Sequence, residues 1–187
     1  ATHRIITNRS FVYEISSEKS LPIFYLPLGS QISVESFSNY WAKITLPNQY
    51  KIINGFIPKN HLVPINHILE DWVIVAENLV ETPYIWGGRD TLGLDCSALL
   101  QLSCQTNGKY LPRNTIDQLN INGEIITNIN DLKRGSVVFW SRHVGIMKND
   151  RICIHANAFH MKTVEEPLTN IISRLAAQND IIKMINF

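Results

Sequence analysis

The stretch at residues 84–103 constrains this chain more than any other, because it places a cysteine at the start of a helix. Three glycines and Asp95 interrupt the chain just before an apolar run with helical spacing, and Gly108 stands where such a helix would end. Asp95 is a favourable N-cap residue, which puts Cys96 in the first turn. There the helix dipole and the free amide N–H groups favour the nucleophilic thiolate. The pattern therefore predicts a reactive thiol, although a free cysteine is more often a small buried apolar side chain.

A nucleophilic cysteine needs a base, and the later part of the chain offers two histidines. Residues 135–140, 143–147 and 151–155 have the composition of strands, and an Asn-Asp turn signal separates the last two. His143 opens one of these strands and His155 closes its neighbour. An antiparallel hairpin would bring the two imidazoles together, so that His143 takes the thiol proton and His155 orients the ring of His143.

Five short segments, in this order, resemble the motifs of one known family. They are YIWGG at residues 84–88, GLDCS at 93–97, LPR at 111–113, HVGI at 143–146 and IHA at 154–156. Over residues 70–187 the chain resembles the NlpC-type papain-like cysteine peptidases, which cut peptidoglycan stem peptides. The resemblance implies that Cys96 is the nucleophile, His143 the base and His155 the third, orienting residue.

The first third of the chain has a different pattern, with short alternating runs separated by turn signals. Several short strands at such spacing indicate a small barrel, and the order of the runs resembles a bacterial SH3-like domain. We therefore predict an α+β protein, with an all-β SH3-like barrel at residues 1–65 and a papain-like NlpC-type peptidase domain at 66–187. Within the second domain, the spacing predicts a core-facing helix over residues 67–81.

The resemblance also suggests residues that contact the substrate. Family members with an N-terminal SH3-like domain act as dipeptidyl-type γ-D-glutamyl peptidases, in which Asp95 and Ser97 would hold the free L-alanine amine and the D-glutamate. Both residues also suit helix capping. Tyr84 is a candidate oxyanion donor beside the backbone N–H of Cys96, or equally a packing residue. Tyr50 is a candidate contact from the SH3-like domain, or a surface tyrosine.

Three other readings stay open. Cys96, Cys153, His143 and His155 are zinc-ligand types, but the close Cys-x-x-Cys pairing of structural zinc sites is absent. The chain would also suit a non-catalytic cell-wall-binding module that uses the SH3-like domain. Acyl transfer is the third reading, since an amine can resolve the same thioester.

Composition limits the classes of partner. A net charge of +1 gives no reason to expect nucleic acid, and no apolar run reaches transmembrane length. Three cysteines make a disulfide framework unexpected and favour a reducing compartment. We expect a cytoplasmic protein, or a periplasmic or secreted one if a leader preceded Ala1. The predicted function is hydrolysis of the γ-D-glutamyl–diamino acid amide (L-Ala-γ-D-Glu–diaminopimelate) in peptidoglycan peptides, without cofactor or metal.

Overall fold

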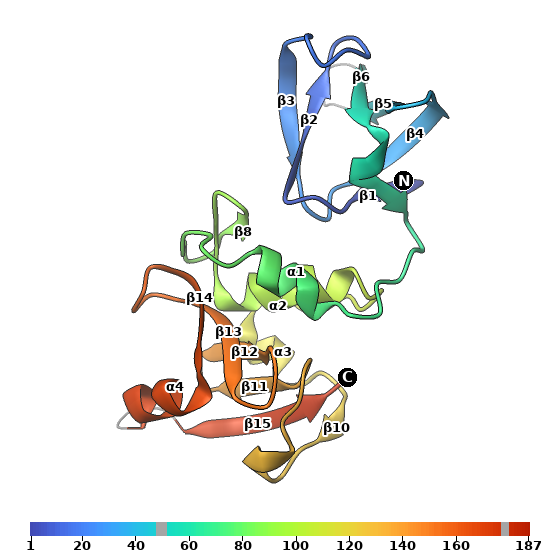
Figure 1. Ribbon diagram of the computed structural model, residues 1–187. Helices are drawn as coiled ribbons and strands as arrows, with labels where there is room; N and C mark the ends of the chain where they lie inside the picture. The colour runs from blue at the N-terminus through green and yellow to red at the C-terminus, as the bar shows by residue number, and fades with distance from the viewer. Residues whose placement is uncertain (48–51, 177–179) are drawn as a thin grey trace. The chain divides into compact units, whose positions relative to one another are not determined.

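The computed structural model describes residues 1–47, 52–176 and 180–187. The chain forms two compact units, residues 1–67 and residues 68–187 (Figure 1). The sequence places the corresponding boundary after residue 65. Each unit has its own sheet and its own apolar core, and each is described by itself below.

The N-terminal unit is an antiparallel sheet in the order β3-β2-β6-β5-β4-β1-β7. Its strands are β1 (His3–Ile5), β2 (Arg9–Tyr13), β3 (Pro22–Pro27), β4 (Gln31–Phe37), β5 (Trp41–Pro47), β6 (Ile52–Pro58) and β7 (Leu62–Pro64), with a short 3-10 helix, η1 (Lys59–His61), before β7. Alternation along the strands directs one set of side chains inward, as a period of two requires. This core consists of Ile5, Val12, Ile32, Ala42, Ile44, Ile57 and Leu62.

The described strands of this unit form an open sheet, and the closed barrel expected from the sequence is not seen. The strand order runs from β3 at one edge to β7 at the other, and no ladder between described residues joins these edges. Register shifts in β2 and β4 mark bulges, which bend strands without pairing the sheet edges. The sequence predicts the spacing of the strands between β1 and β7. The three-residue strands β1 and β7 are too short to show alternation.

The C-terminal unit is built on a second antiparallel sheet, in the order β10-β15-β11-β12-β13-β14. Its strands are β10 (Glu124–Ile125), β11 (Val137–Trp140), β12 (His143–Met147), β13 (Ile152–Asn157), β14 (Lys162–Pro167) and β15 (Ile181–Asn186). Two further short strands, β8 (Arg89–Asp90) and β9 (Gly93–Leu94), pair separately. The predicted strand over residues 143–147 matches β12, whereas β13 extends two residues beyond the predicted end.

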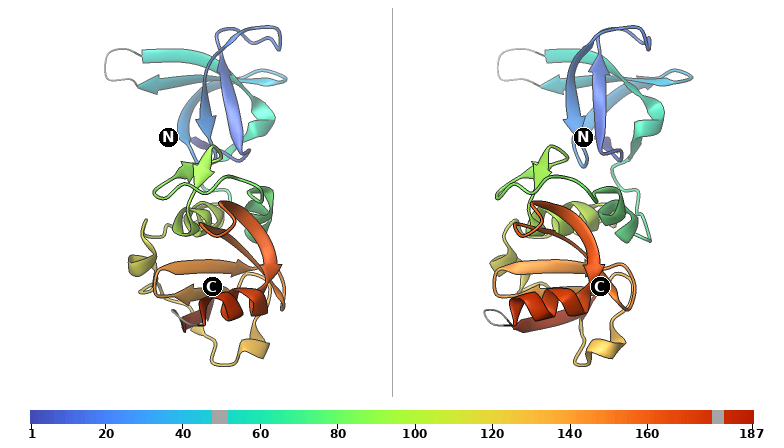
Figure 2. Two further views of the ribbon diagram at one scale, coloured as in Figure 1. Left: turned by 90° about the vertical axis from the view of Figure 1, so that its left-hand side faces the viewer. Right: turned by 60° about the vertical axis from the view of Figure 1, so that its left-hand side comes forward.

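Helices cover this sheet from opposite sides, as both views of Figure 2 show for α2 (Cys96–Gln105) and α4 (Leu168–Leu175). Helix α2 contacts β12 and β13, and α4 buries Leu168 and Ile171 against Val138 and Trp140. The remaining helical segments are α1 (Val73–Asn78), α3 (Thr115–Gln118) and the 3-10 turn η2 (Ile129–Asp131). In the described residues, no helix has the length and apolar character needed to cross a membrane.

The structure agrees with the predicted start of α2 and shortens the predicted helix at residues 67–81. The carboxylate of Asp95 accepts the backbone N–H of Ala98, as an N-cap should. Helix α1 covers only 73–78. The backbone N–H of Leu69 bonds to the carbonyl of Thr106 instead of starting the helix, and Glu81 has a positive φ of 71° that breaks it.

Candidate active site

Cys96 lies at the first position of α2, on the wall of a pocket of about 340 Å³. Its side chain is mostly buried, with 8% of the residue exposed. The pocket draws its walls from the glycine-rich approach to α2, the start of α3 and the loop before β12. Its lining residues are Tyr84, Trp86, Asp95, Cys96, Ser97, Asn114, Thr115, Ile116 and Arg142.

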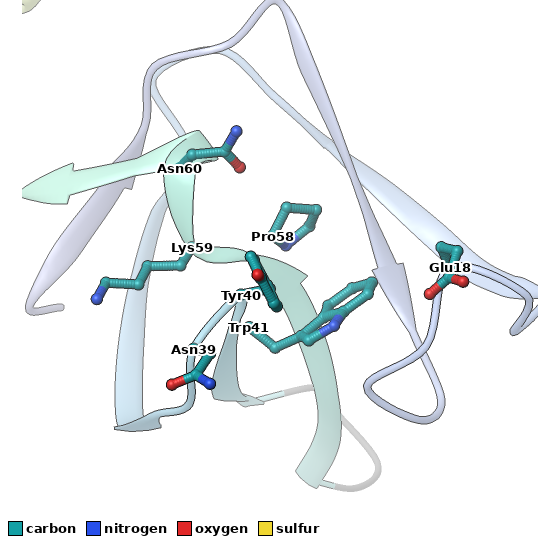
Figure 3. Close-up of a pocket in the computed structure, with 7 residues that line it drawn as sticks. All are labelled: Glu18, Asn39, Tyr40, Trp41, Pro58, Lys59 and Asn60. Atoms are coloured by element: carbon teal, nitrogen blue, oxygen red, sulfur yellow. The ribbon is translucent and has the colours of Figure 1, made fainter.

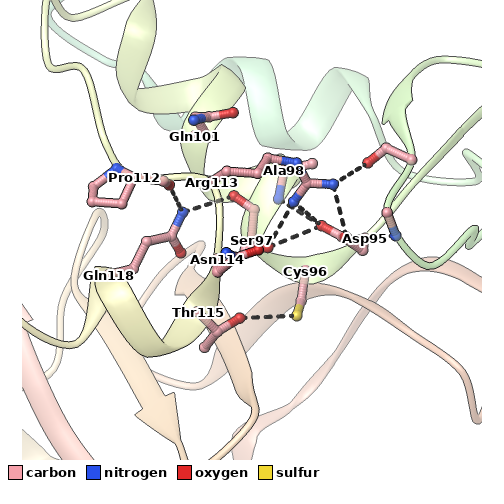
Figure 4. A network of polar contacts seen from close by, with 12 residues as sticks. Asp95, Cys96, Ser97, Ala98, Gln101, Pro112, Arg113, Asn114, Thr115 and Gln118 are labelled. Carbon is pink, nitrogen blue, oxygen red and sulfur yellow. Dashed lines mark hydrogen bonds and ion pairs between the residues drawn. The ribbon is translucent and has the colours of Figure 1, made fainter.

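Hydrogen-bond donors surround the sulfur, yet burial keeps it protonated. The Sγ atom lies 3.7 Å from the hydroxyl oxygen of Thr115 (Figure 4). Burial raises the pKa of the Cys96 thiol, and the charge of Asp95 adds to this effect. Thr115 and the N–H groups of Val144 and Ser97 act in the opposite direction, without reversing it. Desolvation therefore outweighs the effect expected from the helix start.

The two histidines predicted to act with Cys96 lie in contact on the β12–β13 hairpin. Nε2 of His143 is 2.7 Å from Nδ1 of His155. The sulfur of Cys96 accepts the N–H of Val144, the residue that follows His143 in β12, so the thiol lies at the start of this strand. Burial lowers the pKa of His143 to about 3 and that of His155 to about 4, the latter despite a carboxylate that opposes the shift. At neutral pH the site therefore holds a thiol and two neutral imidazoles.

An acidic residue that the sequence analysis missed completes this row of side chains. Nε2 of His155 is 2.6 Å from Oε1 of Glu166, and both carboxylate oxygens of Glu166 accept hydrogen bonds from Arg174. Glu166 is in β14, opposite Cys153 of β13 in the strand register. Glu166 reaches His155 from the neighbouring strand and Arg174 comes from α4, so no local sequence pattern indicated their contacts.

Asp95 and Ser97, the predicted substrate contacts, are already bonded within the protein (Figure 4). The Asp95 carboxylate accepts five hydrogen bonds: two from Arg113, and one each from Ser97, Gly87 N–H and Ala98 N–H. Although burial opposes ionisation, Arg113 and the two N–H groups hold the pKa of Asp95 below its usual value. The hydroxyl of Ser97 also accepts a bond from Arg113. In this state the acid and the serine anchor the start of α2.

The two predicted tyrosines differ in what the structure shows of them. Tyr84 lines the pocket, and burial raises the pKa of its phenol, which stays protonated and able to donate. Tyr50 lies outside the described residues. Two further residues of the pocket had no role assigned from the sequence. Trp86 is 88% exposed, and Arg142 makes no ion pair within the described residues.

A second pocket, of about 590 Å³, belongs entirely to the N-terminal unit (Figure 3). Aromatic side chains contribute to its wall, among them Tyr40, which is 79% exposed. The full lining is Glu18, Asn39, Tyr40, Trp41, Pro58, Lys59 and Asn60. Over the described parts of both units, no three His, Cys, Asp or Glu residues are grouped so as to hold a metal ion.

Comparison with known proteins shows which family this chain resembles. The sequence profile of the NlpC/P60 family matches residues 81–177. The γ-D-glutamyl-L-lysine dipeptidyl-peptidase of Bacillus subtilis (strain 168) is 24% identical over 139 residues, which cover 73% of this chain and 44% of that protein. Dipeptidyl-peptidase 6 of Lysinibacillus sphaericus is 31% identical over 90 residues, 47% of this chain and 32% of that one. This chain thus spans less than half the length of these curated relatives.

Solved structures show the same fold. An NlpC/P60 family protein from Bacillus cereus ATCC 10987 superposes with a TM-score of 0.82 at 19% identity, covering all of this chain and 63% of its own. The NlpC/p60 domain of the peptidoglycan hydrolase SagA gives a TM-score of 0.52 at 24% identity, over 63% of this chain and 97% of that domain. At these identities the likeness establishes the fold alone, and the chemistry must be argued from the site.

Proposed function

Because the chain belongs to the NlpC/P60 family of peptidoglycan hydrolases, we propose that it is a cysteine peptidase that cleaves the γ-D-glutamyl–diamino acid amide of peptidoglycan stem peptides. One observation carries the proposal: the thiol of Cys96 opens to a pocket at the start of β12, where His143 contacts His155 at 2.7 Å. A nucleophile, a base and an orienting group are the parts that this chemistry needs.

The reaction would begin from neutral groups. His143 takes the proton of Cys96 as the sulfur attacks the substrate carbonyl, so that both charges form together. Backbone N–H groups at the start of α2 and the Tyr84 hydroxyl are candidate donors to the developing oxyanion. The imidazolium of His143 then protonates the leaving amine, which leaves an S-acyl enzyme. Water, deprotonated by His143, attacks the thioester and returns the thiol.

The charge of the pocket supports an anionic substrate. Arg113 neutralises Asp95, whereas Arg142 carries a positive charge with no ion-pair partner in the described residues. A γ-linked D-glutamate keeps its α-carboxylate free, and an arginine side chain is well suited to bind such a carboxylate. The dipeptidyl-peptidase names of two relatives support a substrate with a free amino terminus, in which L-Ala-γ-D-Glu is joined to a diamino acid.

The sequence alone supports two further parts of the proposal. The strand spacing of residues 1–65 supports an SH3-like domain, and the odd count of three cysteines fits a cytoplasmic location.

The test is cleavage of defined peptides by the full chain under reducing conditions. Mass spectrometry would follow L-Ala-γ-D-Glu–diaminopimelate, alone and with its amino terminus acetylated. We expect release of L-Ala-D-Glu from the free peptide, little from the acetylated one, and loss of turnover in Cys96→Ala. Cys104→Ala is the matched control, because this thiol is buried further along α2 and does not line the pocket.

Three outcomes would count against the proposal. Intact peptides with folded protein would contradict hydrolysis of this bond. Turnover in Cys96→Ala equal to that of Cys104→Ala would contradict the nucleophile. Products joined to an added amine in preference to water would instead indicate acyl transfer.

A further inference from the structure

The carboxylate behind the histidine pair has no part in the mechanism above, but its position constrains which nitrogen can act as the base. We propose that Glu166, held by Arg174, is a positioning residue that fixes the tautomer of His155 and thereby leaves Nδ1 of His143 free to take the proton of Cys96. The inference rests on the proposed function for its catalytic meaning. Its structural part can be tested without any substrate.

Glu166 is mostly buried, with 9% of the residue exposed. Although burial opposes ionisation, Arg174 and His155 hold the pKa of Glu166 below its usual value. Nη1 of Arg174 donates to Oε2 at 3.0 Å, and Nη2 donates to Oε1. An ionised carboxylate accepts hydrogen bonds and donates none. The nitrogen that lies 2.6 Å from Oε1, Nε2 of His155, must therefore carry the proton.

A second neighbour of the same nitrogen does not reverse this assignment. Nδ2 of Asn157 lies 3.3 Å from Nε2 of His155. The orientation of that amide is set by the backbone N–H of His160, which donates to Oδ1 of Asn157 at 2.8 Å. Removing the proton from Nε2 would improve this long contact, but it would set a lone pair against a carboxylate at 2.6 Å. The shorter, charge-assisted bond decides the tautomer.

The tautomer of His155 determines which ring nitrogen of His143 carries the proton. His155 is neutral at pH 7, so a proton on Nε2 leaves Nδ1 as an acceptor. That acceptor lies 2.7 Å from Nε2 of His143, which must then donate. A neutral His143 with its proton on Nε2 has an unprotonated Nδ1. This is the ring nitrogen that remains for the thiol.

Other polar groups surround the carboxylate of Glu166. Arg174 comes from α4, and His155 and the buried Cys153 come from β13. Nδ1 of His160, in the turn after β13, lies 3.9 Å from Oε1 of Glu166. Among these groups, Arg174 makes the paired contact, so it holds Glu166 ionised and fixes the direction in which both histidines donate.

Glu166→Gln is the informative change, with Glu165→Gln as its matched control. Glutamine offers a donor as well as an acceptor, and Arg174 competes for its single oxygen, so the amide NH₂ turns toward His155. Glu165 is the preceding residue of β14, is exposed, and pairs with Lys148 at 2.8 Å. Glu166→Asp restores an acceptor-only group on a shorter side chain and should recover part of any loss.

The first readout is the nitrogen spectrum of ¹⁵N-histidine-labelled full-length protein at pH 7. Two-bond ¹⁵N–¹H correlations identify which ring nitrogen is protonated. We expect Nε2–H in both His143 and His155 of the unmodified protein and of Glu165→Gln, and a shift of both rings toward Nδ1–H in Glu166→Gln. Nδ1–H in either ring of the unmodified protein would overturn the inference, whether or not any variant folds.

The second readout is turnover of the peptide substrate, checked against circular dichroism for folding. We expect kcat of Glu166→Gln to fall by about 10²-fold or more with KM little changed, because a wrong tautomer removes the base and not the binding site. A kcat within about threefold of Glu165→Gln would contradict the inference. Failure of the proposed function would look different: the unmodified protein would not cleave, while its tautomers would still match the assignment.

Discussion

Replacing Asp95 with asparagine tests how the start of α2 is held. The amide can keep its oxygen in the place of Oδ1, but its NH₂ then replaces Oδ2 and faces two donors, Gly87 N–H and Nη2 of Arg113. The change removes the buried charge of a pair whose arginine is partly exposed, so we expect a loss near the lower end of the about 3–5 kcal/mol that breaking a buried pair costs. For a chain of this length, 1 kcal/mol lowers Tm by about 3 °C. We therefore expect Asp95→Asn to unfold about 10 °C below the unmodified protein.

The control is Asp71→Asn, which breaks the bidentate contact of Asp71 with Arg134. Those side chains are 45% and 34% exposed, so the loss should stay below about 1 kcal/mol, or about 3 °C. Differential scanning fluorimetry of the full chain would compare the two. A decrease in Tm for Asp95→Asn no larger than that for Asp71→Asn would refute the reasoning. A double-mutant cycle with Arg113→Met should show that the second change costs less once the first is made.

The same variant separates the two roles considered for Asp95. If its carboxylate serves the helix alone, KM for the free-amine peptide stays within about threefold at a temperature where the variant is folded. A KM increase that disappears with the acetylated peptide would show contact with the substrate ammonium. The five hydrogen bonds already made by Asp95 favour the first result.

Two further predictions concern the β12–β13 hairpin. Gly145→Ala should destabilise the protein by about 1–3 kcal/mol in chemical denaturation, because the added Cβ would overlap the buried sulfur of Cys153. Unchanged stability would contradict this packing. The depressed pKa values of His143 and His155, about 3 and about 4, mean that the unfolded chain binds more protons below about pH 6.5. The contribution of the two histidines to the free energy of unfolding should be fully present above that pH. It should fall by about 1 kcal/mol per pH unit for each histidine toward pH 4. A free energy of unfolding that does not change over this window would argue against their burial.

Much of the fold could be predicted because the informative signals are local. Asp95 before an apolar run with helical spacing fixes the start of α2, and the apolar run at residues 143–147 corresponds to β12. The failures involve tertiary contacts. The predicted helix at 67–81 is cut short where Leu69 bonds to Thr106, a partner that helical spacing cannot reveal. Closure of the N-terminal sheet was inferred from strand spacing, which says nothing about how edge strands pair.

In the site, too, local features could be predicted from the sequence and tertiary ones could not. Cys96, His143 and His155 could be proposed from residue type and order, because Cys96 opens α2, His143 opens β12 and His155 lies on the next strand, β13. Their protonation could not, since it depends on burial that only the folded chain has; this is why a helix-start thiol with a raised pKa was unexpected. Glu166 reaches His155 across a strand ladder, so the sequence gives no local sign of the contact.

Two arginine–carboxylate pairs hold the reacting groups. Arg113 and Asp95 fix the start of the helix that carries the sulfur, and Arg174 and Glu166 contact the ring of His155, which lies beside His143, the proposed base. Each carboxylate is buried while its arginine is partly exposed, so each pair carries the desolvation cost of a buried carboxylate. Such an arrangement makes sense if the two pairs serve to hold the thiol and the imidazole in position. A neutral thiol and a neutral imidazole attract each other weakly, and their productive alignment must therefore come from what lies behind them.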